Sequence, residues 1–468
     1  MTKIKFGTDG WRAIIAEEFT VDNVARVSEA TALWLKKNNA QPSVVVGHDC
    51  RFAGDLFAET TTKVMLHHGV KVYLAKGFVS TPMVSMGAIS YKADLGVVIT
   101  ASHNPPAYNG FKLKGSYGGP LLPDKIDEIE AIIPAQANAA WKEVSMDAAA
   151  KDGRLVIVDL EGDYCKKVEE SFDLDAIRNS NLEFAYDAMY GAGQNVIRRL
   201  LPDTTLLHCE HNPSFDGQAP EPIAKNLTEF SEMIRLAGNI DCGLATDGDA
   251  DRIGLFDQDG NFVDSHHIIL LLIHYLKKYK GLDGKVCTAF SSTVKVRKMC
   301  QHYGLDLEVV KIGFKYIAGI MITDDVLLGG EESGGIAIKG HIPERDGIWM
   351  GLVIWEFMAK SGKTLNQLIE EVYEITGAFS VDRNDLHLAE SEKQRVIASC
   401  KNGEVKNIGD RPVIRVEDMD GFKFFVSEDE WLMVRPSGTE PLLRVYAEAH
   451  DHAGVMKLIG DARKQFGI

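Results

Sequence analysis

The chain has 468 residues, and its 51 Lys and Arg against 67 Asp and Glu give a formal net charge of −16. This excess of negative charge argues against nucleic acids and anionic membrane surfaces as partners, because both carry negative charge themselves. At roughly 150 residues per domain, the length predicts about three or four domains.

The seven cysteines are scattered singly, without a Cys-x-x-Cys pair, which indicates reduced thiols rather than a disulfide framework or a zinc site. The N-terminal sequence MTKIKFGTDGWR has no hydrophobic signal segment. The longest wholly aliphatic run, residues 268–273, is far too short to span a membrane. We therefore expect a cytoplasmic protein, and the sequence leaves open whether it is a monomer or a dimer.

Three segments of the chain repeat one pattern, in which a short apolar strand is followed by a polar or glycine-containing loop and an amphipathic helix. The repeats cover residues 42–69, 182–201 and 284–304. Strands that alternate with helices predict three similar mixed α/β domains, each with a sheet between helices. After residue 376, strand-like runs alternate with tight turns before an expected helix over 453–466. This last part predicts a smaller α+β domain.

Changes in composition divide the chain into four predicted domains. An alanine-rich polar stretch around residues 135–150 is typical of the end of a first domain. The expected domains are 1–150, 151–257, 258–376 and 377–468.

Ser102 lies in the run TASHNP, residues 100–105, directly after the apolar stretch LGVVIT. The stretch predicts a buried strand, and its end would present the Ser102 hydroxyl at the sheet edge where open α/β sheets bind ligands. A simple turn cap before Pro105 is the structural alternative. Downstream, Lys112 could hold a phosphate or, if its pKa is lowered, relay a proton, and His103 could do the same.

The sequence DGDADR, residues 247–252, places three aspartates at alternate positions after a predicted strand at 239–246. Carboxylate oxygens of this kind suit a hard cation such as Mg²⁺. A calcium-binding EF-hand loop is excluded, since it requires Gly where Arg252 stands and Glu where Gln258 stands. A solvated acidic turn is the alternative, but Arg252 next to the carboxylates favours a phosphate-bridged site.

Two further turns carry polar groups suited to a sugar phosphate. GEESGG, residues 330–335, offers carboxylates and a hydroxyl to vicinal sugar hydroxyls, although solvent-facing acids on a turn are the alternative. RPSGTEP, residues 435–441, offers a guanidinium and two hydroxyls to a phosphate, with a plain β-turn as the alternative.

In this order and spread over the whole chain, TASHNP, DGDADR, GEESGG and RPSGTEP resemble the motifs of the α-D-phosphohexomutases. The N-terminal FGTDGWR, residues 6–12, is similar to the opening motif of that family. The resemblance implies three similar α/β domains and a fourth, smaller domain with a four-stranded antiparallel sheet, arranged around one central cleft. It also implies a phosphoserine enzyme that exchanges phosphate with a hexose monophosphate through a 1,6-bisphosphate, with Mg²⁺ as cofactor and glucose 1,6-bisphosphate as activator and intermediate.

The resemblance assigns roles to residues in all four motifs. The catalytic group would be Ser102, His103, Lys112, Arg12 and Arg252; the metal ligands Ser102, Asp247, Asp249 and Asp251; the sugar-binding residues Glu331, Ser333 and Arg345; the phosphate-binding residues Arg435, Ser437, Gly438, Thr439 and Arg444; and further cations of the cleft Lys295 and Lys315.

The choice of sugar depends on finer details. GEESGG followed by HIPERDG, residues 341–347, resembles the phosphoglucomutase pattern and favours glucose. Gly335 stands where phosphomannomutase/phosphoglucomutases often have histidine, and phosphoglucosamine mutases usually read GEQSGH. Use of mannose as well stays open, because one hydroxyl separates the two sugars. A phosphoserine hydrolase and a non-catalytic sugar-phosphate sensor are the alternatives from other functional classes.

Overall fold

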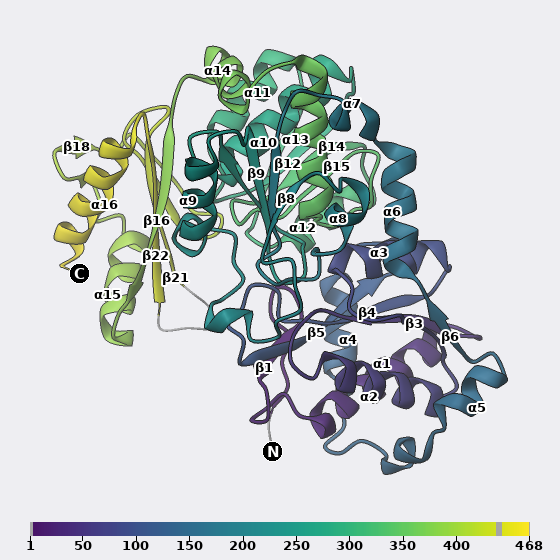
Figure 1. Cartoon of the computed structure of the whole chain (residues 1–468). Coiled ribbons are helices and arrows are strands. Elements are labelled where there is room, and N and C mark those ends of the chain that lie inside the picture. The colour runs from purple at the N-terminus through teal and green to yellow at the C-terminus, as the bar shows by residue number, and fades with distance from the viewer. Residues whose placement is uncertain (1–2, 437–441, 468) are drawn as a thin grey trace.

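The computed structural model describes residues 3–436 and 442–467 (Figure 1). The first sheet has six strands in the order β1-β5-β4-β2-β3-β6. Its strands are β1 (Trp11–Ile14), β2 (Ser43–His48), β3 (Lys71–Ala75), β4 (Leu95–Ile99), β5 (Tyr108–Gly115) and β6 (Leu155–Val158). Its helices are α1 (Val21–Asn38), α2 (Gly54–His67), α3 (Thr81–Ser90), α4 (Pro123–Glu130), the 3₁₀ turn η1 (Ala139–Glu143) and α5 (Met146–Lys151). Because β6 pairs with β3, this sheet extends past residue 150, where the sequence places the first boundary.

The second sheet has five strands in the order β11-β10-β9-β7-β8. They are β7 (Phe184–Asp187), β8 (Thr205–Leu207), β9 (Cys242–Thr246), β10 (Ile253–Asp257) and β11 (Phe262–Val263). The helices of this part are α6 (Leu160–Ser171), α7 (Leu174–Arg178), α8 (Val196–Leu200), α9 (Thr228–Ala237) and the 3₁₀ turns η2 (Phe215–Gly217) and η3 (Ala224–Asn226).

The third sheet has four strands in the order β13-β12-β14-β15. They are β12 (Lys285–Ala289), β13 (Leu307–Val310), β14 (Val326–Gly330) and β15 (Ile336–Ile338). The helices of this part are α10 (Ser265–His274) with its π-helical end η4 (Tyr275–Tyr279), α11 (Lys295–Tyr303), α12 (Phe314–Met321), α13 (Gly347–Ser361) and α14 (Leu365–Thr376).

The three sheets share one topology, which confirms the predicted repeat. In each sheet a central strand pairs in parallel with one strand on either side. One of these two neighbours, which is β4, β9 or β14, also pairs with the strand that follows it in the chain, in antiparallel orientation. The strands β4, β9 and β14 are buried along their whole length, as expected for apolar strands covered by helices on both faces. TASHNP, DGDADR and the turn of GEESGG follow these three strands, so the three motifs occupy equivalent positions in the three units.

The C-terminal part forms a smaller antiparallel domain. Its sheet has the order β16-β22-β21-β20-β19, with a separate pair β17-β18. The elements are β16 (Ser380–His387), α15 (Glu390–Lys401), β17 (Asn407–Ile408), β18 (Arg411–Pro412), β19 (Arg415–Glu417), β20 (Phe422–Phe425), β21 (Trp431–Pro436), β22 (Leu442–Ala449) and α16 (His452–Phe466). The expectation of a four-stranded sheet is wrong, because the Asp420-Gly421 turn folds β19 back onto β20 as a fifth strand.

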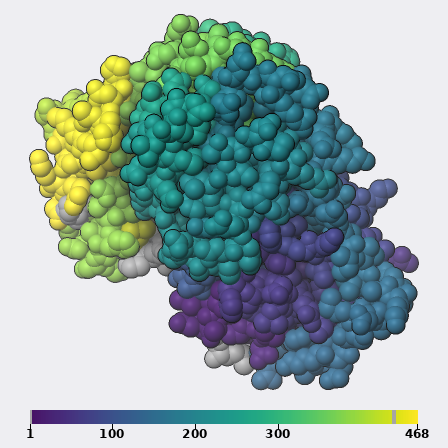
Figure 2. All heavy atoms as spheres, viewed as in Figure 1, coloured from purple at the N-terminus to yellow at the C-terminus, as the bar shows by residue number. Residues whose placement is uncertain are grey.

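The apolar cores show how these parts are joined. The second and third units share one continuous core, in which Leu244, Leu328 and Trp355 all belong to the same cluster. The bulk of the first unit and the C-terminal domain each have a core of their own. Figure 2 shows the first unit below the middle of the molecule and the C-terminal domain at its left side. Among the described residues, no helix combines the length and the apolar character needed to cross a membrane.

Candidate active site

Ser102 begins the turn after β4 and lies at the meeting point of the first two units. Its side chain is buried, and its backbone has a φ of 54°, in the left-handed region that non-glycine residues rarely adopt. The Ser102 hydroxyl donates a 2.7 Å hydrogen bond to Oδ2 of Asp247 and lies 3.3 Å from Nδ1 of His103. The nucleophile expected from the sequence therefore contacts both a predicted metal ligand and an imidazole.

Asp247, Asp249 and Asp251 form a compact carboxylate cluster. All three are fully buried, and one oxygen from each lies within 4.8 Å of the others. Oδ1 of Asp249 and Oδ1 of Asp251 have no hydrogen-bond partner. Buried carboxylate oxygens without a partner are costly unless a cation binds them. The donor set thus suits Mg²⁺, which prefers oxygen ligands.

Lys112 and Arg345 neutralise the other side of this cluster. Lys112 Nζ donates to Asp249 at 2.8 Å and to Asp251 at 3.1 Å. Arg345 donates to Asp251 at 2.6 Å, and both cations also contact Asp9. Asp9 therefore links the first unit to the third across the cluster, at a point where two buried cations converge.

The surroundings set the charge of the groups near Ser102. Burial acts to lower the pKa of Lys112, but the carboxylates of Asp249, Asp251 and Asp9 raise it well above its ordinary value. The condition under which Lys112 could relay a proton, a lowered pKa, is therefore not met. Burial lowers the pKa of the His103 imidazole well below its usual range, and nearby arginines lower it further.

Arg12 and Arg252 lie beside the same groups. Arg12 donates to the Asn104 side chain at 2.6 Å and lies 3.7 Å from Asp9. The Arg252 backbone donates to Asp247 at 3.0 Å, and its guanidinium lies 3.4 Å from Glu221. Arg12 thus contacts the loop that carries Ser102, and Arg252 contacts the carboxylate cluster through its backbone.

The GEESGG turn packs directly on the end of the DGDADR loop, residues 247–252, which we call the metal loop. The backbone of Ile253, which follows DGDADR, donates to Gly334 at 3.1 Å. Glu331 is buried and accepts a 2.8 Å hydrogen bond from the Gly313 backbone. Burial raises the pKa of Glu331 to about 7, and the neighbouring Glu332 raises it as well. Ser333 is partly exposed on the same turn.

Gly335 has a packing role in this turn. A Cβ atom at this position would come within 2.3 Å of Cδ of Arg345. The absence of a side chain therefore gives the Arg345 stem its path toward Asp9 and Asp251.

The structure places the predicted phosphate-binding residues in the C-terminal domain. Arg435 lies near the end of β21 and is the cross-strand partner of Arg444 on β22. Arg435 donates to Asp420 at 3.1 Å, and Arg444 lies 3.9 Å from Asp385. The remaining members of this prediction lie outside the described residues: Ser437, Gly438 and Thr439.

The two further cations have different surroundings. Lys295, at the start of α11, is buried and lies 3.2 Å from Asp429 of the C-terminal domain. Lys315 lies near the start of α12, with its ammonium 5.5 Å from the ring centre of Tyr316. No described contact joins either of them to Ser102 or to the carboxylate cluster.

Sequence reasoning missed several residues that shape this site. Asp9 belongs to the FGTDGWR motif, in which the resemblance points only to Arg12, and Asp49 and Arg51 belong to a loop that the sequence indicates only as part of the repeat. Thr81 donates to Asp249 from the start of α3 at 2.5 Å, and no pattern in the sequence indicates this contact. Each of these residues acts on a partner far away in the chain.

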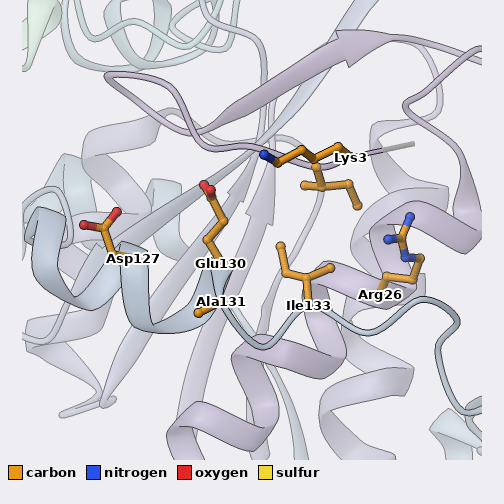
Figure 3. Close-up of a pocket in the computed structure, with 7 residues that line it drawn as sticks. Lys3, Arg26, Asp127, Glu130, Ala131 and Ile133 are labelled. Atoms are coloured by element: carbon orange, nitrogen blue, oxygen red, sulfur yellow. The ribbon is translucent and has the colours of Figure 1, made fainter. Parts of the chain in front are cut away.

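The pocket in Figure 3 is separate from this site. It encloses about 460 Å³ and is lined by Lys3, Ile4, Arg26, Asp127, Glu130, Ala131 and Ile133. None of the predicted site residues lines it.

Comparison with known proteins gives the chain a family. Models of the phosphoglucomutase/phosphomannomutase family match residues 3–140, 162–260 and 264–375 as its α/β/α domains I, II and III, and residues 390–465 as its C-terminal domain. A phosphoglucomutase/phosphomannomutase of Thermococcus kodakarensis is 29% identical over 95% of this chain and 94% of its own length.

Two further comparisons cover nearly the whole chain. A relative from Pyrococcus furiosus that is named as a phosphoglucosamine mutase is 31% identical over 98% of this chain and 96% of its own length. A crystal structure described as a phosphomannomutase from Thermus thermophilus is 32% identical and matches with a TM-score of 0.87 over 100% of both chains. The chain therefore belongs to the phosphoglucomutase/phosphomannomutase family, and it is a phosphohexomutase, an enzyme that transfers a phosphoryl group within its substrate.

Proposed function

We propose that the protein interconverts the 1-phosphate and 6-phosphate of a hexose through a phosphorylated Ser102. The contact that carries this proposal is the 2.7 Å hydrogen bond from the Ser102 hydroxyl to Asp247. It places a nucleophile at a carboxylate cluster that still has two unpartnered oxygens. A phosphate on Ser102 would lie between these carboxylates and the cations Arg12 and Arg252.

Asp247, Asp249 and Asp251 would hold the Mg²⁺ ion together with an oxygen of phospho-Ser102. When bound there, Mg²⁺ supplies a Lewis acid that offsets negative charge on the transferring phosphoryl oxygens. Lys112 keeps its positive charge next to Asp249 and Asp251, which limits the repulsion among the three carboxylates.

The proton of the attacking sugar hydroxyl also needs an acceptor. In the first transfer the Oγ–P bond of Ser102 breaks, a bond from phosphorus to the sugar oxygen forms, and the proton of the sugar hydroxyl leaves. We assign this proton to His103, because its ring lies 3.3 Å from Ser102 Oγ. Lys112 and Arg12 already donate to Asp249 and Asn104. In the return transfer the bond between phosphorus and the other sugar oxygen breaks, the Oγ–P bond of Ser102 forms again, and the proton goes from His103 to the sugar oxygen that the phosphate leaves.

The sugar must be held while it presents both ends in turn. Glu331 and Ser333 would accept and donate hydrogen bonds to hydroxyls that stay equivalent after the sugar turns over. Arg345 would orient the sugar next to the carboxylate cluster. The phosphate that does not react would bind to the C-terminal domain, at Arg435, Ser437, Gly438, Thr439 and Arg444, and the intermediate would be a hexose 1,6-bisphosphate such as glucose 1,6-bisphosphate. Lys295 and Lys315 would add to the positive potential of the cleft.

For the sugar itself, we propose glucosamine phosphate as the preferred substrate, followed by mannose phosphate. The glucose preference expected from the GEES and HIPERDG segments is not confirmed by the relatives. Curated relatives over nearly the full length bear the names phosphoglucosamine mutase and phosphoglucomutase/phosphomannomutase. We also propose a cytoplasmic location and four domains, and the ranges of the four family models support the division into four. Of the expected ranges 1–150, 151–257, 258–376 and 377–468, the first two extend further, because β6 belongs to the first sheet and β11 to the second.

One assay separates these substrates. Purified protein with Mg²⁺ and a trace of the matching hexose 1,6-bisphosphate is offered the 1-phosphates of glucosamine, mannose and glucose, and kcat/KM is compared. A tenfold or larger preference for glucosamine phosphate is expected. A preference for glucose phosphate would overturn the choice of sugar but not the reaction. Release of inorganic phosphate instead of the 6-phosphate would overturn the mutase and favour a phosphoserine hydrolase.

A further inference from the structure

Arg51 is a buried arginine that binds the backbone of the phosphoserine loop. It lies in the loop between β2 and α2, with its side chain fully buried. Its two terminal nitrogens donate to four carbonyl oxygens of that loop, at 2.6 Å to Ser102, 2.6 Å to Asn104, 2.9 Å to Pro105 and 3.0 Å to Tyr108. A planar guanidinium can serve several carbonyls at once, which a lysine ammonium cannot do in the same geometry.

Asp49 completes this support from the other side. Arg51 Nε lies 3.3 Å from Oδ2 of Asp49, and the same oxygen accepts a 2.5 Å hydrogen bond from the Thr100 hydroxyl. The Thr100 hydroxyl in turn accepts a 2.8 Å hydrogen bond from the Ser102 backbone. The amide and the carbonyl of Ser102 are therefore both held by the loop that follows β2.

Hydrogen bonds with Arg51 and Thr100 hold Ser102, whose backbone is strained. Ser102 has a φ of 54°, and a non-glycine residue in the left-handed region costs of order 1–3 kcal/mol. Such a conformation persists only where the surroundings fix it. The described hydrogen bonds of the Arg51 side chain all go to residues 102–108, so its contacts serve the loop rather than the rest of the first unit.

The second unit touches the same support. The ring centre of Phe215 lies 5.0 Å from the Arg51 guanidinium carbon, and Phe215 is 2% exposed. A Cβ atom on Gly248, in the metal loop, would come within 2.5 Å of the Ser102 carbonyl oxygen. Arg51 and the metal loop therefore both pack against the Ser102 carbonyl, and Phe215 of the second unit packs against the Arg51 guanidinium.

Equivalent loops support the other two motifs. After β7, the central strand of the second sheet, the Ala192 backbone donates to Gly248 of the metal loop at 2.9 Å. After β12, the central strand of the third sheet, the Ser291 hydroxyl donates to Glu332 of the GEESGG turn. The loop after the central strand thus contacts the motif loop in all three repeats, which makes the Arg51 contacts part of a repeated arrangement.

We propose that Arg51 is a positioning residue for the phosphoryl transfer: it fixes the left-handed Ser102 turn that directs the hydroxyl to Asp247, and Phe215 couples this turn to the second unit. The proposal rests on the function proposed above for Ser102. If it is correct, loss of the Arg51 guanidinium makes residues 100–108 more mobile and slows phosphoryl transfer to and from Ser102. Sugar binding at the GEESGG turn stays intact.

The test uses the full chain with Arg51→Lys and, independently, Phe215→Leu. Hydrogen exchange measured by mass spectrometry is expected to become at least tenfold faster for the amides of Ser102, Asn104 and Tyr108, which are bonded within this loop region. The rate of phosphate transfer from a hexose 1,6-bisphosphate to Ser102 is measured by the intact mass of the protein. We expect this rate and kcat to fall about 100-fold in Arg51→Lys, as for other small displacements of a reacting group. KM is expected to change less than threefold. Phe215→Leu is expected to change the same quantities in the same direction by a smaller factor.

Arg198→Lys is the matched control, because Arg198 also donates to a backbone carbonyl, that of Cys209 at 2.6 Å, but outside the site. It should change neither the exchange of residues 100–108 nor kcat. The proposal would be overturned if Arg51→Lys exchanged its amides and turned over substrate as the wild type does. It would also be overturned if the loss of kcat came with a matching rise in KM or with faster exchange throughout the first sheet. The exchange measurement needs no activity. If the wild-type protein itself lacks mutase activity, the proposed function fails, while faster exchange confined to the Ser102 loop still shows that Arg51 fixes that loop.

Discussion

The Ser102 hydroxyl donates a 2.7 Å hydrogen bond to Asp247, although the two residues are 145 positions apart in the chain. Each of them follows an apolar strand that occupies the same place in its own sheet, β4 in the first and β9 in the second. The two motif loops therefore meet edge to edge between two repeats of one fold. A nucleophile supplied by one repeat and a cation site supplied by the next are placed together without either unit containing the whole site.

Replacement of Ser102 by alanine should remove mutase turnover by three or more orders of magnitude, because no other hydroxyl takes its place as phosphate carrier. The variant should fold normally and should gain no mass of a phosphoryl group when it is incubated with a hexose 1,6-bisphosphate. Ser214→Ala serves as the control and should keep full activity, because this serine is exposed and its hydroxyl donates to Asn212, outside the site. Full turnover in Ser102→Ala would contradict the phosphoserine mechanism.

Removal of the metal should abolish activity reversibly. Treatment with a chelator is expected to inactivate the enzyme, and added Mg²⁺ should restore it. In the wild-type protein, saturating Mg²⁺ should raise Tm, since a ligand at 100 times its Kd stabilises the folded state by about 2.7 kcal/mol. Asp249→Asn should lose both the rise in Tm and the activity, whereas Asp216→Asn, at an exposed aspartate, should keep both. Equal metal-dependent stabilisation of Asp249→Asn would show that the ion binds elsewhere.

Gly335→Ala tests whether activity depends on the position of the Arg345 side chain. The new Cβ would come within 2.3 Å of Cδ of Arg345, so the arginine must leave its contacts with Asp9 and Asp251. We expect kcat/KM to fall about 10- to 100-fold, as for other displaced substrate-positioning groups. Gly460→Ala is the matched control, since nothing lies within 4 Å of its Cβ position in α16, and it should stabilise the protein by up to about 1 kcal/mol. Unchanged kcat/KM in Gly335→Ala would rule out this role for Arg345.

Stability should depend on pH through Glu331. Burial raises its pKa in the folded protein to about 7, above its ordinary value of 4.5, so the folded state binds this proton more tightly than the unfolded state. The free energy of unfolding should therefore fall as the pH rises from about 4.5 to about 7, by at most about 3.5 kcal/mol at about 1.4 kcal/mol per pKa unit. Below pH 4.5 and above pH 7 this contribution should be constant.

Urea unfolding of the wild type and of Glu331→Gln at pH 5 and pH 8 measures this contribution. Glutamine is uncharged at both values, so the difference in unfolding free energy between the two proteins should shift in favour of the wild type at pH 5. A difference that does not change with pH would show that Glu331 is already ionised in the folded protein at pH 5.

Much of the architecture could be predicted because its signals are local. The apolar runs that became β4, β9 and β14 are bounded by turn residues, and the three repeats follow from strand and helix periodicity within short windows. Pairing between distant segments was harder to anticipate. β6 joins the first sheet beyond the expected boundary, and β19 adds a fifth strand to the last domain, because strand addition depends on which edges are free.

The sequence by itself determined the four motifs, their order and the residue types that can carry phosphate, bind a hard cation and bind a sugar. Only the tertiary structure decided that Asp9 joins Lys112 to Arg345, that Arg51 holds the Ser102 turn and that Lys112 keeps its proton. The physical reason is that hydrogen bonds and pKa values depend on neighbours in space. Around Ser102, those neighbours come from three different sheets.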